Sequence, residues 1–589
     1  MSKLPIAETK TKPPPTAESP PCTGMSADEK TLPLTAAGLV ILCVSLALLI
    51  GNIGFQGDDW WQFSWPFWHA FPSSVWEYAK ASRRPVEGLY TVVAFEFFGL
   101  NRVFYTLSAL SLLAGACLLM GSCLKKAFPG RDSLVVLSVA FAFLMPPASN
   151  LIYMFHTDNS RLSILFFWVS VLLFQRWADG SKSWTGLLLP LAVYLLAAFT
   201  YENTTFLIFA IPLMVWPIHA RCRGKVSDLT FLSRILVGIT SGFAMFVLTR
   251  FAVFSGGAVG HRSLIPPANL IWSYLSNLAW YCLAPFHELC SDKMAWLWGL
   301  SAALIIAALL FRAAKNELQA QENSNAPEQS SLYIAVLGLV LLVLGVLPYL
   351  MAGYDSPPGL TSQSRIFSSG FFGLAIMLAV LFSSSTNKFV LYGKKAAAVV
   401  MIAFMAFFLA GLRNNWLEAA RERDKIHASL LQSVPKVAPG TSLVFLDLQS
   451  YISDGEIGKA VVFQGVDGLG EFVKMLYNEK DLYAYFIYPK EAAANDTEGR
   501  KALVSPKGLV VRGSAVRPPI PLDSLLILKR EGDRIVLLDK LSSEEGNAAI
   551  EWNGVSEIRS NPELIKPGQA AVGSVVDGVK RNRPPIVPH

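Results

Sequence analysis

Long apolar runs dominate the first two thirds of this chain and limit what it can fold into. Between about residue 33 and residue 412 of its 589 residues, mostly apolar stretches recur, separated by short polar loops. A stretch of roughly 18 or more such residues crosses a hydrocarbon layer about 30 Å thick when it is helical. Charged residues make up only 16% of the chain, against roughly 25% in soluble domains. We therefore predict an α-helical polytopic membrane protein rather than a soluble protein with buried core helices.

The apolar runs divide into about eleven candidate transmembrane helices of the length a bilayer requires. They are expected at 33–54, 102–124, 132–147, 160–177, 184–200, 204–218, 231–254, 294–313, 331–352, 366–383 and 390–412. The stretch 87–99 contains Glu87 and Glu96, so we expect an interfacial helix there, with a spanning helix as the alternative. The segment between 254 and 294 is expected to be a loop.

The distribution of basic residues predicts the orientation of the helices. With the N-terminus in the cytoplasm, the inside loops hold most of the basic residues near the spans, as the positive-inside rule requires. These are Lys125, Lys126, Arg131, Arg176, Lys182, Arg221, Arg223, Lys225, Arg312, Lys315, Lys388, Lys394 and Lys395. Residues 1–32 are polar and rich in Pro, which predicts a disordered cytoplasmic segment. Residues 33–412 then form the transmembrane domain, and an odd number of spans places 413–589 outside the cytoplasm.

The C-terminal part of the chain has the pattern of a soluble domain. Short apolar stretches punctuated by Gly and Pro predict β-strands there. They lie at 442–446, 460–463, 482–488, 522–528 and 534–538. Residues 413–589 are therefore expected to form a mixed α/β or β-rich extracytoplasmic domain.

Two adjacent carboxylates, Asp58 and Asp59, follow the first expected span and precede Trp60 and Trp61. One interpretation is a helix cap, because Asp favours helix N-termini. The other is a general base or metal ligand held at the membrane interface, where Trp is a common residue. The sequence leaves both interpretations open.

Other expected outside loops carry polar residues that would lie at the same depth. Their members are Arg83 and Arg84 before Pro85, then His156, Asp158, Arg161, Tyr201, Glu202 and Arg365. Glu202 is either a turn residue or part of a pocket wall. Arg365 is either an interfacial residue that snorkels to headgroups or a ligand of a lipid phosphate, whose oxygens match a guanidinium fork.

An acidic pair directly after the first span, followed by a long amphipathic loop that ends in an Arg-Pro element, resembles the GT-C superfamily of membrane glycosyltransferases. The resemblance covers the expected topology of the whole chain, but matching sequence motifs occur only around residues 58–85. Many bacterial members have Gly-Arg-Pro or Gly-Arg-Trp where this chain has Ser82-Arg83-Arg84-Pro85, without the Gly. Several members also end in a soluble extracytoplasmic domain, and the resemblance implies a bacterial inner membrane.

The resemblance implies an inverting transfer of a sugar from a polyprenyl-phosphate donor to an acceptor hydroxyl on the extracytoplasmic face. Asp58 or Asp59 would be the catalytic base, and Arg83, Arg84 or Arg365 would bind the donor phosphate. His156, Asp158, Arg161, Tyr201 and Glu202 are further pocket candidates. The partners expected are the donor lipid, membrane lipid and a glycan, lipid or protein acceptor.

No cofactor is required by this chemistry, and a divalent cation is possible, although no pair of His residues has helical ligand spacing. Nucleic acid is not expected as a partner, because no basic stripe interleaved with aromatic residues occurs. The alternatives are a transporter or flippase of lipid-linked saccharides and a non-catalytic envelope assembly protein. The former would be expected to have charged residues within its spans or paired broken helices, and the latter would need neither Asp58 nor Asp59.

Overall fold

The structure of the protein is a computed structural model, which describes most of the residues on which these predictions rest. The described residues are 38, 54–55, 57–180, 183–221, 227–254, 267–287, 293–323, 331–352, 366–383, 388–448, 451–452, 460–461, 466–487, 502–511, 519–543 and 550–566. The first expected span, 33–54, therefore lies almost entirely outside the described residues, and so does Arg365.

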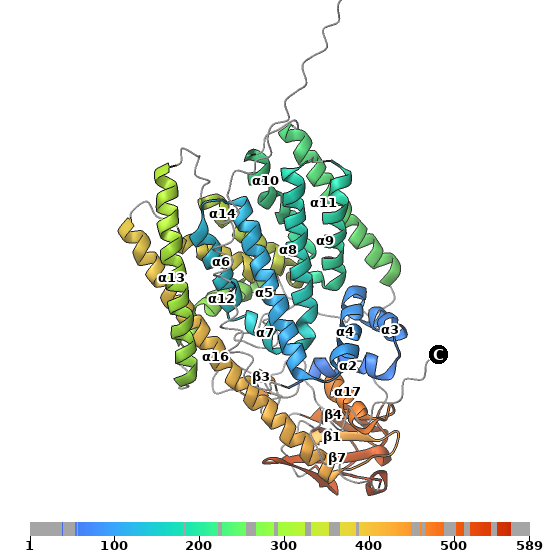
Figure 1. Cartoon of the computed structure of the whole chain (residues 1–589). Coiled ribbons are helices and arrows are strands. Elements are labelled where there is room, and N and C mark those ends of the chain that lie inside the picture. Colours follow the sequence, from blue (N-terminus) through green and yellow to red (C-terminus); the bar gives the residue numbers. More distant parts are fainter. Residues whose placement is uncertain are drawn as a thin grey trace, which may run out of the picture.

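A bundle of helices forms the upper part of the molecule in Figure 1. Most of the apolar runs have become its helices, because a helix satisfies its own backbone hydrogen bonds within an apolar layer. They are α5 (Arg102–Ala127), α6 (Asp132–Leu144), α7 (Ala148–Tyr153), α8 (Asp158–Asp179), α9 (Leu188–Thr200), α10 (Ile211–Arg221), α11 (Asp228–Phe254), α12 (Pro267–His287), α13 (Lys293–Asn323), α14 (Ser331–Met351), α15 (Phe371–Ser383) and α16 (Lys388–Ser433). Short 3-10 segments η1 (Phe155–Thr157), η2 (Thr185–Leu187) and η3 (Glu202–Ala210) precede α8, α9 and α10.

Six helices among the described residues are long and apolar enough to cross a membrane. They correspond to the expected spans that begin at 102, 160, 204, 231, 331 and 390. The expected spans at 132, 184, 294 and 366 contain shorter apolar helices, such as α6 and α15 with 13 residues each. The total of eleven spans is therefore not confirmed. One prediction was wrong, because the expected loop after α11 contains the helix α12.

Three short helices lie beside the bundle, next to the soluble domain (Figure 1). They are α2 (Gly57–Trp68), α3 (Ser73–Ser82) and α4 (Pro85–Phe98). With 14 residues, α4 is shorter than the roughly 20 residues a spanning helix needs, which favours the interfacial interpretation of 87–99.

The C-terminal part, which the sequence predicts to be a soluble domain, is built on a mixed sheet with the strand order β4-β1-β7-β8. Strand β1 (Ser442–Leu446) pairs in parallel with β4 (Tyr483–Ile487) and with β7 (Leu525–Glu531), and β8 (Arg534–Leu538) pairs antiparallel to β7. These four strands fall on or within a few residues of predicted ones. Helix α17 (Val466–Tyr477) packs against β4, so the domain is mixed α/β.

Smaller elements complete this domain. The expected strand at 460–463 is the short β3 (Ala460–Val461), paired with β2 (Tyr451–Ile452). The others are β5 (Ala502–Ser505), β6 (Gly508–Val511), β9 (Lys540–Ser542), β10 (Ile550–Trp552), β11 (Glu557–Arg559), η5 (Leu522–Ser524) and η6 (Pro562–Leu564).

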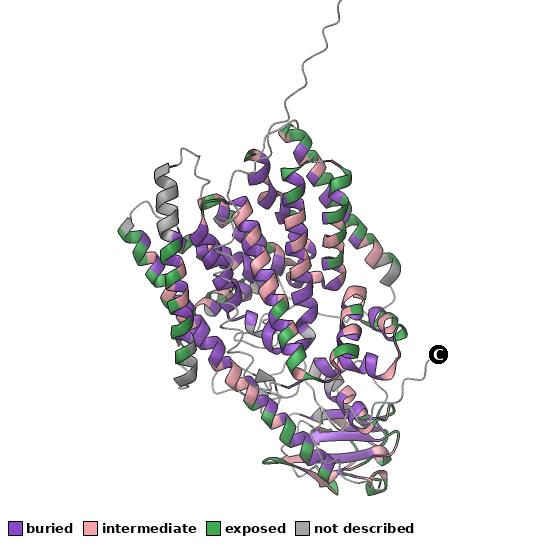
Figure 2. Ribbon diagram, viewed as in Figure 1, coloured by how far each residue is buried: buried purple, intermediate pink, exposed green. Residues whose placement is uncertain are grey.

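Helix α16 connects the two parts without a break. Its 46 residues correspond to about 69 Å at 1.5 Å per residue, far more than a hydrocarbon layer requires. The helix therefore continues past residue 413, the expected start of the soluble domain, and its C-terminal part packs on β8. Buried residues fill both the centre of the bundle and the sheet, whereas exposed residues lie on the outer helices (Figure 2).

Candidate functional site

The acidic pair lies in the first turn of α2, as the capping interpretation expects. Its two carboxylates have different surroundings. Asp58 is partly exposed, whereas Asp59 is fully buried, with an exposed fraction of 0%. The charge of Asp59 acts on Arg161 of α8 and on Arg423 of α16. Asp59 thus faces the bundle, and Asp58 is the carboxylate of the pair that remains accessible.

A buried arginine lies in the first turn of α8, where the charge of Asp59 acts on it. Arg161 has an exposed fraction of 0% and forms an ion pair with Asp158, one helical turn earlier. Its guanidinium also donates hydrogen bonds to the Met154 carbonyl (3.3 Å), the Thr157 hydroxyl (3.1 Å) and the Phe155 carbonyl (3.1 Å). Arg161 therefore fixes the turn between α7 and α8, and the predicted pocket residues Asp158 and Arg161 form one unit.

The Arg-Pro element meets the turn between α9 and η3. Arg84 donates two hydrogen bonds to the two carboxylate oxygens of Glu202, both at 2.8 Å, in a bidentate arrangement. The guanidinium carbon of Arg84 lies 4.3 Å from the centroid of the Tyr201 ring. Burial lowers the pKa of Arg84, but the carboxylates Glu202 and Glu87 outweigh this effect and raise it well above its ordinary value.

A second arginine shares the same carboxylate. Arg250, near the end of α11, lies 3.7 Å from Glu202, which places one carboxylate between two guanidinium groups. Glu202 is therefore part of a charged cluster at the end of the bundle, and its place in a pocket wall stays a prediction.

A buried glutamate joins four helices beside this cluster. Glu87 of α4 has an exposed fraction of 2%. Its Oε1 accepts hydrogen bonds from Gln62 of α2 (3.1 Å), Tyr78 of α3 (2.9 Å) and Asn159 of α8 (2.9 Å), while Arg84 lies 3.4 Å from Oε2. Burial raises the pKa of the Glu87 carboxyl, although Arg84 and the hydrogen bond from Tyr78 act against this shift. Glu87 thus holds the acidic helix α2 in register with the Arg-Pro element.

The structure brings most of the predicted site residues to one end of the bundle. Asp58, Asp59, Arg84, Asp158, Arg161, Tyr201 and Glu202 come together there from α2, α4, α8 and η3, through the contacts given above. Arg83 caps the C-terminus of α3, is partly exposed and has a positive φ of 61°. His156 lies in η1, but its side chain is outside the described set, and Arg365 is outside the described residues.

Sequence reasoning gave no role to Glu87, Arg250 or Arg423. The signal for Glu87 was present, because a carboxylate inside an apolar stretch needs a buried partner. No comparable signal marked Arg250, whose partner Glu202 is far away in the sequence.

A metal site is not formed by the described side chains. Among them, no group of three or more His, Cys, Asp or Glu residues is arranged to hold a metal ion. The divalent cation that the sequence allowed remains a prediction.

Comparisons with known proteins add little. No protein-family model matches the chain, and no curated protein matches it. Among solved structures, it is similar to ArnT from Cupriavidus metallidurans in the apo state, at 13% sequence identity and a TM-score of 0.33. That match covers 92% of this chain and 100% of the other. At this TM-score the likeness does not bear on the chemistry of the site.

Proposed function

We propose that this membrane protein is an inverting glycosyltransferase that moves a sugar from a polyprenyl-phosphate donor to an acceptor hydroxyl. The observation that carries the proposal is that a partly exposed carboxylate, Asp58, and the charged cluster of Arg84, Glu202 and Arg250 both lie at one end of the bundle. Such a reaction needs a base for the acceptor and cations for the departing phosphate. The motif-level resemblance to GT-C enzymes around 58–85 points in the same direction.

Asp58 is assigned as the catalytic base, and Asp59 as the residue that anchors α2. The Asp58 carboxylate takes the proton of the acceptor hydroxyl, whose oxygen then attacks the anomeric carbon. The bond from that carbon to the phosphate oxygen breaks, and the electron pair leaves with the phosphate. Attack from the opposite face inverts the configuration. A second carboxylic acid is not required, because phosphate leaves without protonation.

The donor phosphate is assigned to Arg83 and Arg365, with Arg84 in the wall of the same pocket. Glu202 already occupies the bidentate face of Arg84, which leaves this guanidinium less able to bind a phosphate in the same way. Arg83 is the neighbouring cation and is partly exposed. His156, Asp158, Arg161 and Tyr201 remain proposed pocket residues.

The proposed orientation places this end of the bundle and the soluble domain outside the cytoplasm. The predicted inside residues Lys125, Lys126 and Arg221 lie together at the other end, since Arg221 donates hydrogen bonds to the carbonyls of Lys126 and Ala127. Reporter fusions after Lys395 and after Ser433 should report opposite sides of the membrane. Reports from the same side would contradict this topology.

The function is tested by an in vitro transfer assay with a panel of polyprenyl-phosphate sugars and acceptor glycans, lipids and peptides. We expect transfer by the wild type and a loss of about 10²–10⁴-fold in rate for Asp58→Asn. Glu77→Gln is the matched control, because Glu77 is an exposed acid on α3 that pairs with Lys80. Full activity of both Asp58→Asn and Asp59→Asn would contradict a carboxylate base, and lipid flipping without transfer would favour a transporter.

A further inference from the structure

The soluble domain contacts the acidic helix directly. Figure 1 shows α17 immediately next to α2, at the boundary between the bundle and the sheet. The Phe472 ring of α17 lies 4.9 Å from the ring of Trp60, measured between centroids. Trp60 follows Asp59 in the chain, so this contact is made one residue away from the acidic pair.

The contact continues into α16, which links the two domains. The ring of His427 stacks on Phe472 at a centroid distance of 4.0 Å and an interplanar angle of 23°. Trp60, Phe472 and His427 therefore form a row of contacting rings, one from each of α2, α17 and α16, in which Trp60 is tilted by 57° against Phe472. All three side chains are buried, with exposed fractions of 3%, 1% and 4%.

Two further contacts hold the ends of this segment. Lys480, just after α17, lies over the ring of Trp68, the last residue of α2, at 5.2 Å from its centroid. Before α2, Gly54 has a φ of 78°, and a Cβ there would lie 2.9 Å from Nη2 of Arg423. The backbone that leads into the acidic pair thus approaches α16 as closely as glycine allows.

Phe63, three residues after Trp60 and on the same face of α2, packs on the bundle. The ring of Phe63 lies 5.6 Å from that of Phe95 in α4 and 5.2 Å from that of Tyr105 in α5. Helix α2 therefore contacts both domains, and its position depends on both.

We infer that the soluble domain sets the position of the acidic pair through the Trp60–Phe472 contact, which makes Phe472 a positioning residue. The soluble domain is then a working part of the site rather than an independent appendage. The coupling between the soluble domain and α2 is a structural claim that needs no assumption about function, whereas its effect on transfer rests on the proposed function.

Hydrogen exchange of the full-length protein in lipid nanodiscs tests the structural half. In Phe472→Leu we expect exchange of the α2 amides to rise by roughly 2- to 12-fold, as the loss of one aromatic pair predicts. Phe445→Leu is the matched control, because Phe445 is equally buried, at 1%, but lies in the central strand β1. It should change exchange in β1 and leave α2 as in the wild type.

The reciprocal variant Trp60→Leu examines the same contact from the membrane side. Trp60→Leu leaves the sequence of α17 unchanged, so a rise in the exchange of the α17 amides must come through the contact. This variant therefore remains informative if Phe472→Leu destabilises α17 directly. Unchanged exchange in α2 of Phe472→Leu together with unchanged exchange in α17 of Trp60→Leu would overturn the inference.

A double-mutant cycle on the transfer reaction tests the functional half. Phe472→Leu should lower kcat and leave KM for the donor unchanged, and it should have no further effect in a Trp60→Leu background. Multiplicative effects in the double variant would mean that Phe472 does not act through Trp60. If the wild type transfers no sugar at all, the proposed function fails, while the exchange experiment still decides whether the domains are coupled.

Discussion

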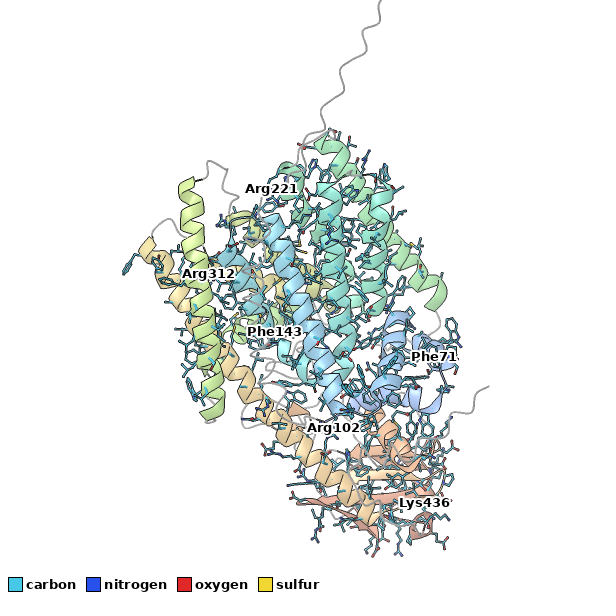
Figure 3. All side chains as sticks on the ribbon, in the orientation of Figure 1. Phe71, Arg102, Phe143, Arg221, Arg312 and Lys436 are labelled. Atoms are coloured by element: carbon cyan, nitrogen blue, oxygen red, sulfur yellow. The ribbon has the colours of Figure 1, made fainter. Side chains whose placement is uncertain are left out.

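The two ends of the helical bundle both carry ion pairs, and the Glu87 network at one end differs from the Lys126–Asp179 pair at the other in burial and in the number of helices it joins. Figure 3 labels Arg102 near the soluble domain and Arg221 at the opposite end. At the Arg221 end, Lys126 pairs with Asp179 at 3.3 Å, with exposed side-chain fractions of 28% and 38%. At the other end, Glu87 is 2% exposed and has partners in three other helices, α2, α3 and α8, besides Arg84 at the start of its own helix.

Under the proposed orientation and function, this difference separates charges that orient the protein from charges that build a site. Arg221 donates hydrogen bonds to carbonyls at the C-terminus of α5, and Lys126 is partly exposed, as the proposed orientation expects of residues on the inside. The Glu87 carboxylate, at 2% exposed, is withdrawn from water, which is costly unless it has partners, whereas Glu202 keeps 33% of its side chain exposed. A cost of this kind is typical of functional sites, and it can be measured by removing one partner at each end.

The largest effect is expected for Glu87→Ala. It would leave the donors of Gln62, Tyr78 and Asn159 without their common acceptor and Arg84 with one carboxylate fewer. Because breaking a buried charged network leaves uncompensated groups, stability should fall by about 3–5 kcal/mol. Thermal unfolding in detergent measures this loss. A change as small as that of a surface ion pair would show that the two ends are built alike.

A smaller effect is expected for Arg84→Lys. Lysine keeps the charge but cannot form both hydrogen bonds to Glu202, so the variant should lose about 1.5–3 kcal/mol of stability. The same measurement on Arg83→Lys, the adjacent and partly exposed position, is the control. Equal losses at both positions would contradict a special role for the Arg84–Glu202 pair.

The pH dependence of stability distinguishes Glu87 from an ordinary carboxylate. Burial raises its pKa in the folded state above the ordinary value of 4.5, so the protonated form favours folding. Its contribution is fully present below the unfolded-state pKa and is lost as the pH rises through the folded-state pKa. The wild type should therefore lose stability relative to Glu87→Gln as the pH rises above the unfolded-state pKa and through the folded-state pKa. A constant difference across this range would exclude a raised pKa.

The smallest effect is expected at the opposite end, for Asp179→Asn. The pair with Lys126 is partly exposed, so its removal should change stability by only about 0.2–1 kcal/mol. Added salt should reduce the difference further, because it screens exposed charges. A loss comparable to that of Glu87→Ala would remove the distinction between the two ends.

The sequence by itself determined the membrane class and the position of several elements. Apolar length is a local property, so α5, α8, α11 and α14 could be located from it. Strands β1 and β8 were located for a similar reason, from short apolar stretches bounded by turn residues. The same local criterion missed α12, because the 267–287 stretch contains polar residues among its apolar ones. Its total of eleven spans is not confirmed.

Only the tertiary structure decided which charges meet. Arg84 and Glu202 are 118 residues apart, and neither carries a local signal for the other. The difference between Asp58 and Asp59 was also inaccessible, because adjacent residues of one type become distinct only when a helix turns one toward the bundle. Burial and partnership depend on packing between distant segments, whereas apolar length is read along the chain, and that is why the helices could be predicted and the site could not be completed.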